Sequence, residues 1–220
     1  MLDTIAYYIS HWNRRRKWNY FSKHFNIQEN TRILDVGYTD IEYSSSDNFL
    51  EKQYPYSKNI TALGIEEPTQ FKKNYPDVNV VVYDGKAFPF KNKIFDIVWS
   101  NAVIEHVGNK EKQLYFLQEM LRVGNKIYMT TPNKYFPIEV HTRIPFLHIF
   151  LPKKLFDSFL QLIGKSWACG DYMHLLSVGD IKRMCKKLSI SKSTYHIHKN
   201  RIAGLVVDFV IIIDASNTYD

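Results

Sequence analysis

The sequence contains few cysteines and no long apolar run. Its two cysteines, Cys169 and Cys185, are too few for a disulfide framework and fit a reducing compartment. No stretch reaches the roughly 18 uninterrupted apolar residues of a transmembrane helix, and the N-terminus lacks the apolar run of a signal peptide. These absences predict a cytoplasmic protein, with peripheral contact to the inner face of a membrane as an additional hypothesis.

Positive charge and aromatic side chains are plentiful. The net charge is +7 and the aromatic content is 15%. An excess of positive charge predicts attraction to a phosphate-bearing substrate, a membrane surface or nucleic acid, without choosing among them. The length of 220 residues and the apolar content of 45% predict one domain, spanning residues 1–220, with a substantial core.

Residues 32–37 are typical of a short buried strand that runs into a glycine. Ile33, Leu34 and Val36 are apolar, and Asp35 is the lone acidic residue before Gly37. A carboxylate at the end of a buried strand is costly without a partner, and a glycine after it lets the backbone turn close to a ligand. We therefore interpret Asp35 and Gly37 as the floor of a cofactor site; the alternative is an ordinary strand-to-turn junction with a solvated aspartate.

Strands and helices alternate along the rest of the chain. Further strands are predicted at residues 60–65, 78–83, 94–100 and 126–130, and helices at residues 3–25, 49–53, 109–122 and 177–188. Residues 193–198 and 205–214 predict a terminal antiparallel hairpin at the sheet edge. The alternation indicates an α/β fold with a mostly parallel sheet and helices on both faces.

Two segments depart from this rhythm. Residues 132–176 are rich in aromatic, proline and histidine residues, and so long a connection predicts a lid or substrate-binding insertion. The run Arg14–Lys17, in the N-terminal helix within residues 1–28, is the most basic spot in the chain. We interpret the run as the solvated face of a helix beside the sheet; the alternative is contact with anionic lipid or nucleic acid.

Polar or glycine markers stand at the carboxyl ends of four successive strands. They are Asp35 with Gly37, Glu66, Asp84 with Gly85, and Ser100 with Asn101. Together with residues 88–90, 95–98 and 101–107, this order resembles the class I S-adenosylmethionine-dependent methyltransferases, in particular the subgroup of ubiquinone- and menaquinone-type enzymes. The resemblance covers roughly residues 30–132, and residues 131–142 resemble a narrower branch met in bacterial surface-polysaccharide contexts.

This resemblance implies a Rossmann-like fold with a central seven-stranded, mostly parallel sheet and S-adenosylmethionine as cofactor. It places Gly37 near the methionine part of the cofactor, Glu66 at the ribose, and Asp84 with Gly85 at the adenine. Asn101 would line the site beside the sulfonium. Phe88 is either the apolar cover of the adenine or a core residue.

The sequence departs from the family pattern twice. The usual Gly-x-Gly-x-Gly loop is here Gly37-Tyr-Thr-Asp40, and Gly64 stands where the acidic residue of the second strand usually falls. Glu66 lies two residues on, on the same strand face, and could substitute. The altered loop favours an alternative function, a catalytically inactive methyltransferase-fold protein that binds a partner or nucleic acid.

His106 is the candidate base or orienting group, because it follows the fourth strand near the expected position of the sulfonium. Glu139, His141 and Arg143 alternate, so an extended segment would project all three into an acceptor pocket. The alternative is a segment that only covers the core. The acceptor is predicted to be a small molecule, a glycan or a lipid-linked molecule.

The apolar segment 144–163 contains Lys153 and Lys154, and it is either a lid helix or an element that enters a membrane interface. No metal site is predicted, because His196 and His198 lack a nearby third ligand. A nucleic-acid substrate is disfavoured, because neither a recognition module nor the Asp/Asn-Pro-Pro-aromatic motif is present.

Overall fold

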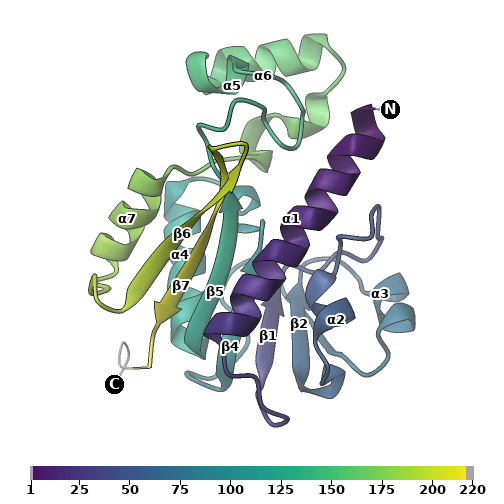
Figure 1. The fold of residues 1–220 in the computed structure, drawn as a ribbon, viewed down its shortest axis with the longest axis vertical. Helices are drawn as coiled ribbons and strands as arrows, with labels where there is room; N and C mark the ends of the chain where they lie inside the picture. The colour runs from purple at the N-terminus through teal and green to yellow at the C-terminus, as the bar shows by residue number, and fades with distance from the viewer. Residues whose placement is uncertain (1, 217–220) are drawn as a thin grey trace.

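A seven-stranded sheet forms the centre of the protein (Figure 1). The structure is a computed structural model that describes residues 2–216, with side chains from residue 10. The strands are β1 (Ile33–Val36), β2 (Ile60–Gly64), β3 (Asn79–Val82), β4 (Phe95–Asn101), β5 (Gly124–Pro132), β6 (Tyr195–Ile202) and β7 (Leu205–Asp214). Their order in the sheet is β3-β2-β1-β4-β5-β7-β6. The first five strands pair in parallel, whereas β7 is antiparallel to both β5 and β6. The predicted mostly parallel sheet with a C-terminal antiparallel hairpin is therefore confirmed.

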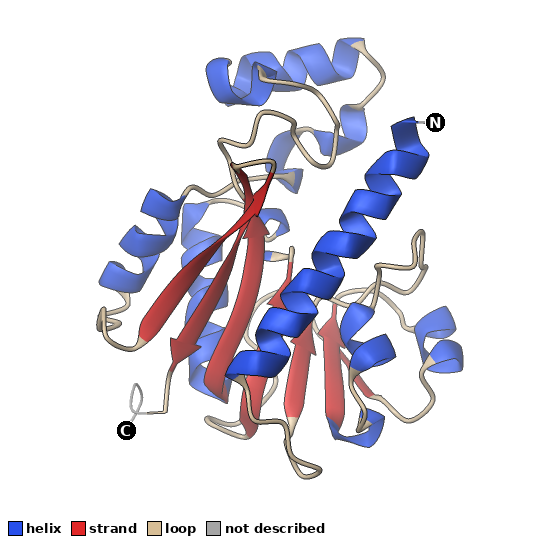
Figure 2. Ribbon diagram, in the orientation of Figure 1, coloured by secondary structure: helices blue, strands red, loops and turns tan. Residues whose placement is uncertain are grey.

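Helices cover both faces of the sheet (Figure 2). The helices are α1 (Leu2–His24), α2 (Phe49–Gln53), α3 (Thr69–Asn74), α4 (Lys110–Val123), α5 (Leu147–Phe150), α6 (Lys153–Leu162) and α7 (Val178–Lys187). Side chains of α4 and α7 pack on one face, against Leu34 and Val36 of β1. Side chains of α1, α2 and α3 pack on the other face, against Ile33. The alternation of β1 therefore places Asp35 on the α1 face. Within residues 2–216 no helix is both long and apolar enough to span a bilayer.

Capping side chains fix where two of the helices begin. The Asn109 side chain accepts hydrogen bonds from the backbone N–H groups of Glu111 and Lys112 at the start of α4. Ser177 and Asp180 form a capping box at the start of α7. Both helices consequently begin within one residue of the predicted start.

The segment predicted as an insertion carries its own small core above the sheet edge (Figure 1). Its helices α5 and α6 pack around Phe156 and Leu160, both of which are buried. A bridge between Asn133 and Leu176 joins the two ends of the segment. A helix not predicted from the sequence, α3, follows β2 after Pro68.

The helix α1 packs beside the sheet as predicted, but its basic run faces partly inward, so the predicted solvated face is wrong for Lys17. Lys17 is 6% exposed, and its Nζ lies 3.6 Å from Oδ2 of Asp208 on β7. Burial lowers the pKa of Lys17 and the pKa of Arg14, although nearby carboxylates oppose the shift. Arg16 donates a hydrogen bond to the backbone oxygen of Arg201. The run turns inward because buried carboxylates on the sheet supply its countercharges.

Candidate functional site

A cavity opens where β1 and β4 end, and we call it the strand-end cavity. Its lining includes Asp35, Gly37 and Asn101, together with Arg14 of α1 and Asp47. The carboxyl ends of parallel strands are where open α/β sheets bind ligands. Half of the six predicted cofactor residues therefore meet at one place. Arg14 was not predicted from the sequence as a lining residue, although it belongs to the basic run of residues 14–17.

Gly37 is required at the floor of this cavity. Its φ is +101°, and a Cβ at this position would lie 2.4 Å from Cγ2 of Val103. The Gly37 N–H donates a 2.8 Å hydrogen bond to the backbone oxygen of Leu63 on β2. A side chain here would meet both backbone strain and a steric clash.

Two buried carboxyls meet behind the cavity. Asp35 is 6% exposed and Glu51 of α2 is 7% exposed. Burial raises the pKa of Asp35 to about 6, although Glu51 and the Arg14 guanidinium oppose the rise. Burial and the neighbouring charge of Asp35 raise the pKa of Glu51 well above its usual range. The pair therefore retains a proton at pH values at which exposed carboxyls are ionised.

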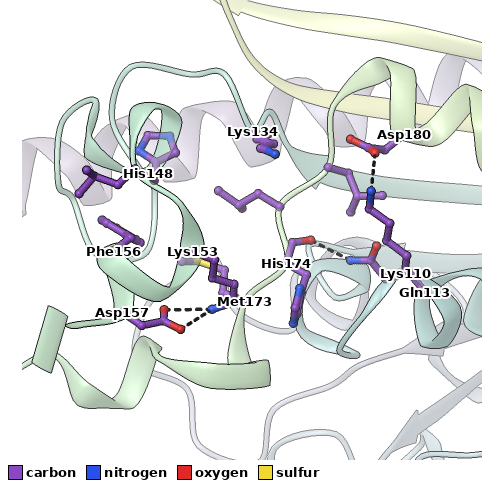
Figure 3. A pocket seen from close by; sticks show the side chains of 13 residues that line it. Lys110, Gln113, Lys134, His148, Lys153, Phe156, Asp157, Met173, His174 and Asp180 are labelled. Carbon is purple, nitrogen blue, oxygen red and sulfur yellow. Dashed lines mark hydrogen bonds and ion pairs between the residues drawn. The ribbon is translucent and has the colours of Figure 1, made fainter. Parts of the chain in front are cut away.

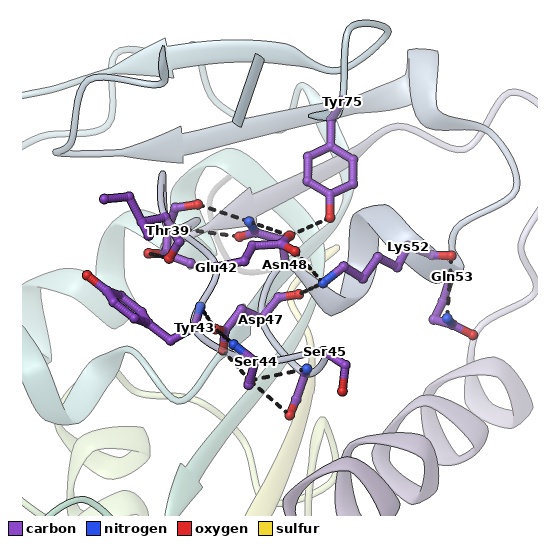
Figure 4. A network of polar contacts seen from close by, with 12 residues as sticks. Thr39, Glu42, Tyr43, Ser44, Ser45, Asp47, Asn48, Lys52, Gln53 and Tyr75 are labelled. Atoms are coloured by element: carbon purple, nitrogen blue, oxygen red, sulfur yellow. Dashed lines mark hydrogen bonds and ion pairs between the residues drawn. The ribbon is translucent and has the colours of Figure 1, made fainter. Parts of the chain in front are cut away.

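Side-chain hydrogen bonds, rather than glycines, shape the loop after β1 (Figure 4). The Asn48 side chain accepts from the Thr39 N–H at 3.0 Å and donates to the Thr39 carbonyl at 2.9 Å. Asp47 accepts from the backbone N–H groups of Tyr43 and Ser44, both at 2.8 Å. Thr39, Asp47 and Asn48 all line the strand-end cavity. The polar loop thus presents fixed side chains where the family pattern presents bare backbone.

The two departures from the family pattern, the altered loop after Gly37 and the glycine at position 64, are linked by the packing of Tyr38 on Gly64. The Tyr38 ring is 6% exposed and lies over Gly64, where a Cβ would come within 2.6 Å of a ring carbon. The Tyr38 hydroxyl donates to the backbone oxygen of Glu66, and its ring packs on Phe71. Because the tyrosine fills this space, the acidic side chain usual at position 64 has no room. Oε2 of Glu66 instead accepts from the Asp40 N–H at 3.1 Å.

The residues predicted for the adenine lie at the surface and are not among those lining the strand-end cavity. Asp84 and Gly85 are exposed, and Asp84 accepts from the N–H of Lys86 at 3.0 Å. Phe88 is 2% exposed and packs against Tyr83 and Phe116. Of the two interpretations of Phe88, the structure supports the core residue.

Two histidines meet beyond the end of β4. His106 lies in a 3-10 turn, Ile104–His106, and its Nε2 is 3.1 Å from Nε2 of His141. Nδ1 of His106 lies 2.9 Å from the backbone oxygen of Tyr172. Glu105 is fully buried, and its Oε2 accepts from Oγ1 of Thr131 at 3.0 Å. We call Glu105, His106 and His141 the histidine cluster, and these residue types could hold a metal ion. The cluster was not predicted from the sequence, because His141 is 35 residues from His106.

The segment with Glu139, His141 and Arg143 is a tight turn, so the expected extended conformation is wrong. The Arg143 N–H donates to the Glu139 carbonyl at 2.7 Å, and Arg143 is exposed with a φ of +61°. Glu139 is 1% exposed, and its Oε1 lies 2.8 Å from Nδ1 of His141. Burial would raise the pKa of Glu139, but hydrogen bonds from His141 and Thr142 outweigh it and lower the pKa to about 2.

A second cavity, the lid cavity, lies between the insertion and the start of α4 (Figure 3). Lys110, Gln113, Lys134, His148 and His174 are among its lining residues. Nζ of Lys110 also lies 3.9 Å from Oδ1 of Asp180, in the first turn of α7. The cavity could not be predicted, because its walls come from the insertion, α4 and α7.

Comparison with known proteins supports the same fold. Residues 43–126 match the family described as a methyltransferase domain. A sarcosine/dimethylglycine N-methyltransferase of Aphanothece halophytica is 27% identical over 113 residues, which are 49% of this chain and 40% of that protein. The chain thus matches less than half the length of this curated relative.

Solved methyltransferase structures are similar at low identity. A Methanosarcina mazei S-adenosylmethionine-dependent methyltransferase has a TM-score of 0.56 at 14% identity, covering 86% of this chain and 94% of that one. A Haemonchus contortus phosphoethanolamine N-methyltransferase, solved with phosphomonomethylethanolamine and S-adenosylhomocysteine, has a TM-score of 0.55 at 14% identity, covering 84% and 39%. The fold, together with the domain matched within residues 43–126, supports a class I S-adenosylmethionine-dependent methyltransferase.

Proposed function

We propose that the protein transfers a methyl group from S-adenosylmethionine to a hydroxyl or amine of a small-molecule, glycan or lipid-linked acceptor. The observation that carries this proposal is the strand-end cavity, in which Asp35, Gly37 and Asn101 meet at the carboxyl ends of β1 and β4. This is the ligand-binding edge of an open α/β sheet. Such a cavity, in a chain of this family, supports cofactor binding there.

The cofactor would extend from this cavity across the ends of β2 and β3. Asp35 would face the cationic amino-acid end, because a carboxylate forms charge-assisted hydrogen bonds with an ammonium group. Asn101 would lie beside the sulfonium, Glu66 at the ribose, and Asp84 with Gly85 at the adenine. The surface position of Asp84 and Gly85 leaves them accessible to a ligand.

The histidine cluster would form the acceptor side. Methyl transfer is an in-line displacement, so the protein contributes mainly by aligning the acceptor atom with the methyl carbon. His106 would orient the acceptor or take its proton. Glu139 would hold the His141 ring in place through its hydrogen bond, and both would line the acceptor pocket. Arg143, which is exposed, would contact an anionic group of the acceptor.

Two features of the insertion, its lysines and its exposed apolar side chains, bear on the class of the acceptor. The lysines of the lid cavity favour an acceptor that carries an anionic group. Phe146, Phe150, Leu155, Leu162 and Trp167 are exposed on the insertion, and these apolar side chains favour a lipid-linked acceptor at a membrane surface. Sedimentation with anionic vesicles at low salt tests this part; a protein that stays in the supernatant would exclude the membrane-bound acceptor.

One observation favours the second candidate, a methyltransferase-fold protein without transfer activity. Tyr38 occupies the space over Gly64, next to the expected ribose position. If the ring excludes the adenosine half, folded protein will bind neither S-adenosylmethionine nor its demethylated product.

A pair of aspartate variants tests the cofactor site. Asp84→Ala should weaken binding of S-adenosylhomocysteine, measured by isothermal titration calorimetry, because it removes the proposed adenine contact. Asp77→Ala is the matched control, since Asp77 is also exposed but precedes β3 rather than following it. Equal affinities for the two variants would refute the adenine placement. His106→Ala should retain cofactor binding and lose turnover.

A further inference from the structure

We propose that Glu105, His106 and His141 bind a divalent transition-metal ion. One ligand atom from each residue lies within 4.8 Å of a ligand atom from each of the other two. Nε2 of His106 lies 3.1 Å from Nε2 of His141 and 3.9 Å from Oε1 of Glu105. Two histidines and one carboxylate form a metal-binding set found with zinc and with non-haem iron. Binding of the ion does not require methyl transfer; only its use in catalysis depends on the proposed function.

The hydrogen bonds of the two histidines fix which ring nitrogens face each other. Nδ1 of His106 contacts the Tyr172 backbone oxygen, and Nδ1 of His141 contacts the Glu139 carboxylate. Both partners can only accept, so both Nδ1 atoms carry protons. In the neutral rings both Nε2 atoms then present lone pairs, at a separation of 3.1 Å. Facing lone pairs repel unless a cation or a shared proton lies between them.

The separation of the nitrogens suits a single metal ion. Zinc–nitrogen bonds of about 2.05 Å in a tetrahedral arrangement place two ligand nitrogens about 3.3 Å apart. The observed 3.1 Å is close to this value. Oε1 of Glu105 lies 3.9 Å from Nε2 of His106, so a small rotation of the carboxylate brings the third ligand into range.

Glu105 provides independent evidence for a cation. Its side chain is fully buried, and Oε1 has no hydrogen-bond partner within residues 2–216. A buried carboxylate oxygen without a partner carries a large desolvation penalty. Coordination of a cation by Oε1 removes this penalty, while Oε2 keeps its bond to Thr131.

The outer contacts resemble those of established metal sites. Metal-bound histidines usually donate their second N–H to a carboxylate or backbone carbonyl, which orients the ring. The Glu139 carboxylate accepts this bond from Nδ1 of His141, and the Tyr172 carbonyl accepts it from Nδ1 of His106. The side chains of His106 and His141 are 26% and 20% exposed, so the ion can enter and keep a coordination position for a ligand.

A bound ion would give the cluster a definite role in transfer to oxygen. An acceptor hydroxyl coordinated to the ion loses its proton to solvent more readily. The acceptor oxygen attacks the methyl carbon, an O–C bond forms as the C–S bond breaks, and the sulfur keeps the electron pair as a neutral thioether. His106 would then be a metal ligand rather than the base.

Titration of chelator-treated full-length protein with Co²⁺ tests the proposal. We expect one ion per chain by calorimetry, with visible absorption bands of cobalt bound to nitrogen and oxygen ligands. His141→Ala should weaken Co²⁺ binding more than tenfold, and Glu139→Gln should weaken it by about 10- to 100-fold through loss of ring orientation. His196→Ala, on the exposed edge strand, is the matched control and should bind as the wild type does.

Folding is checked by circular dichroism for each variant. Glu105→Gln keeps the size of the side chain and tests the buried ligand, while His141→Ala keeps the test decisive if the buried variant unfolds. Absence of Co²⁺ and Zn²⁺ binding to folded wild-type protein would overturn the proposal, as would unchanged binding by His141→Ala. Cofactor binding is measured separately in chelator, so failure of the metal site and failure of the proposed function give different results.

Discussion

The Asp35→Asn variant should be more stable than the wild type above pH 7 and nearly equal to it near pH 4. Asp35 is almost fully buried beside Glu51, and burial raises its pKa from 3.8 to about 6. A raised pKa in the folded state means that the folded protein holds this proton more tightly than the unfolded chain. The stability associated with the proton is therefore present below about pH 4 and is lost as the pH rises through about 6.

The size of the effect follows from the shift. A change from 3.8 to about 6 is about two pKa units, and each unit corresponds to about 1.4 kcal/mol. The wild type should therefore lose up to about 3 kcal/mol between pH 4 and pH 8 through this carboxyl. Asparagine does not ionise, so the variant avoids this loss. Removing the charge of Asp35 also removes its repulsion of the Glu51 carboxylate, which raises the pKa of Glu51 in the wild type. This effect further favours the variant at high pH.

Urea unfolding without cofactor, at pH 4 and at pH 8, measures the difference. The free energy of unfolding of the variant should exceed that of the wild type by about 2–3 kcal/mol more at pH 8 than at pH 4. Asp77→Asn, which changes an exposed aspartate, is the matched control. A difference between Asp35→Asn and wild type that is the same at both pH values would refute the assignment of a buried, protonated carboxyl.

Three further substitutions test the packing around the site by urea unfolding. Gly64→Ala should cost about 1–3 kcal/mol, because the new Cβ meets the Tyr38 ring; a neutral effect would show that the ring does not lie there. Asp208→Ala should cost about 3–5 kcal/mol, because it leaves Lys17 buried without its countercharge, and a loss under 1 kcal/mol would contradict a buried ion pair. Ser177→Ala should cost about 1 kcal/mol by removing the cap of α7, whereas unchanged stability would mean that the capping box contributes nothing.

The sheet was predictable because its strands are short apolar runs that end in polar or glycine residues. Asp35 and Gly37 could be placed at the carboxyl end of the first strand from the apolar run that they close, and the family resemblance added Asn101 at the end of the fourth; all three line the strand-end cavity. The helices α4 and α7 were predictable because Asn109 and Ser177 mark their starts.

Contacts between distant segments were not predictable. Tyr38 and Gly64 looked like two separate losses from the family pattern, and only the packing of the ring on the glycine relates them. The alternation of Glu139 and His141 suggested a strand, but hydrogen bonds within the turn bring their side chains together instead. The burial of Lys17 depends on Asp208, which lies on the last strand of the chain.

Calorimetric titration of the full chain with S-adenosylmethionine and S-adenosylhomocysteine tests the central claim most directly. We predict saturable micromolar binding of at least one of them, and weaker binding as the pH falls below about 6 and Asp35 gains a proton. Absence of binding to protein that is folded by circular dichroism would contradict the account, and would show that the Tyr38 loop closes the site.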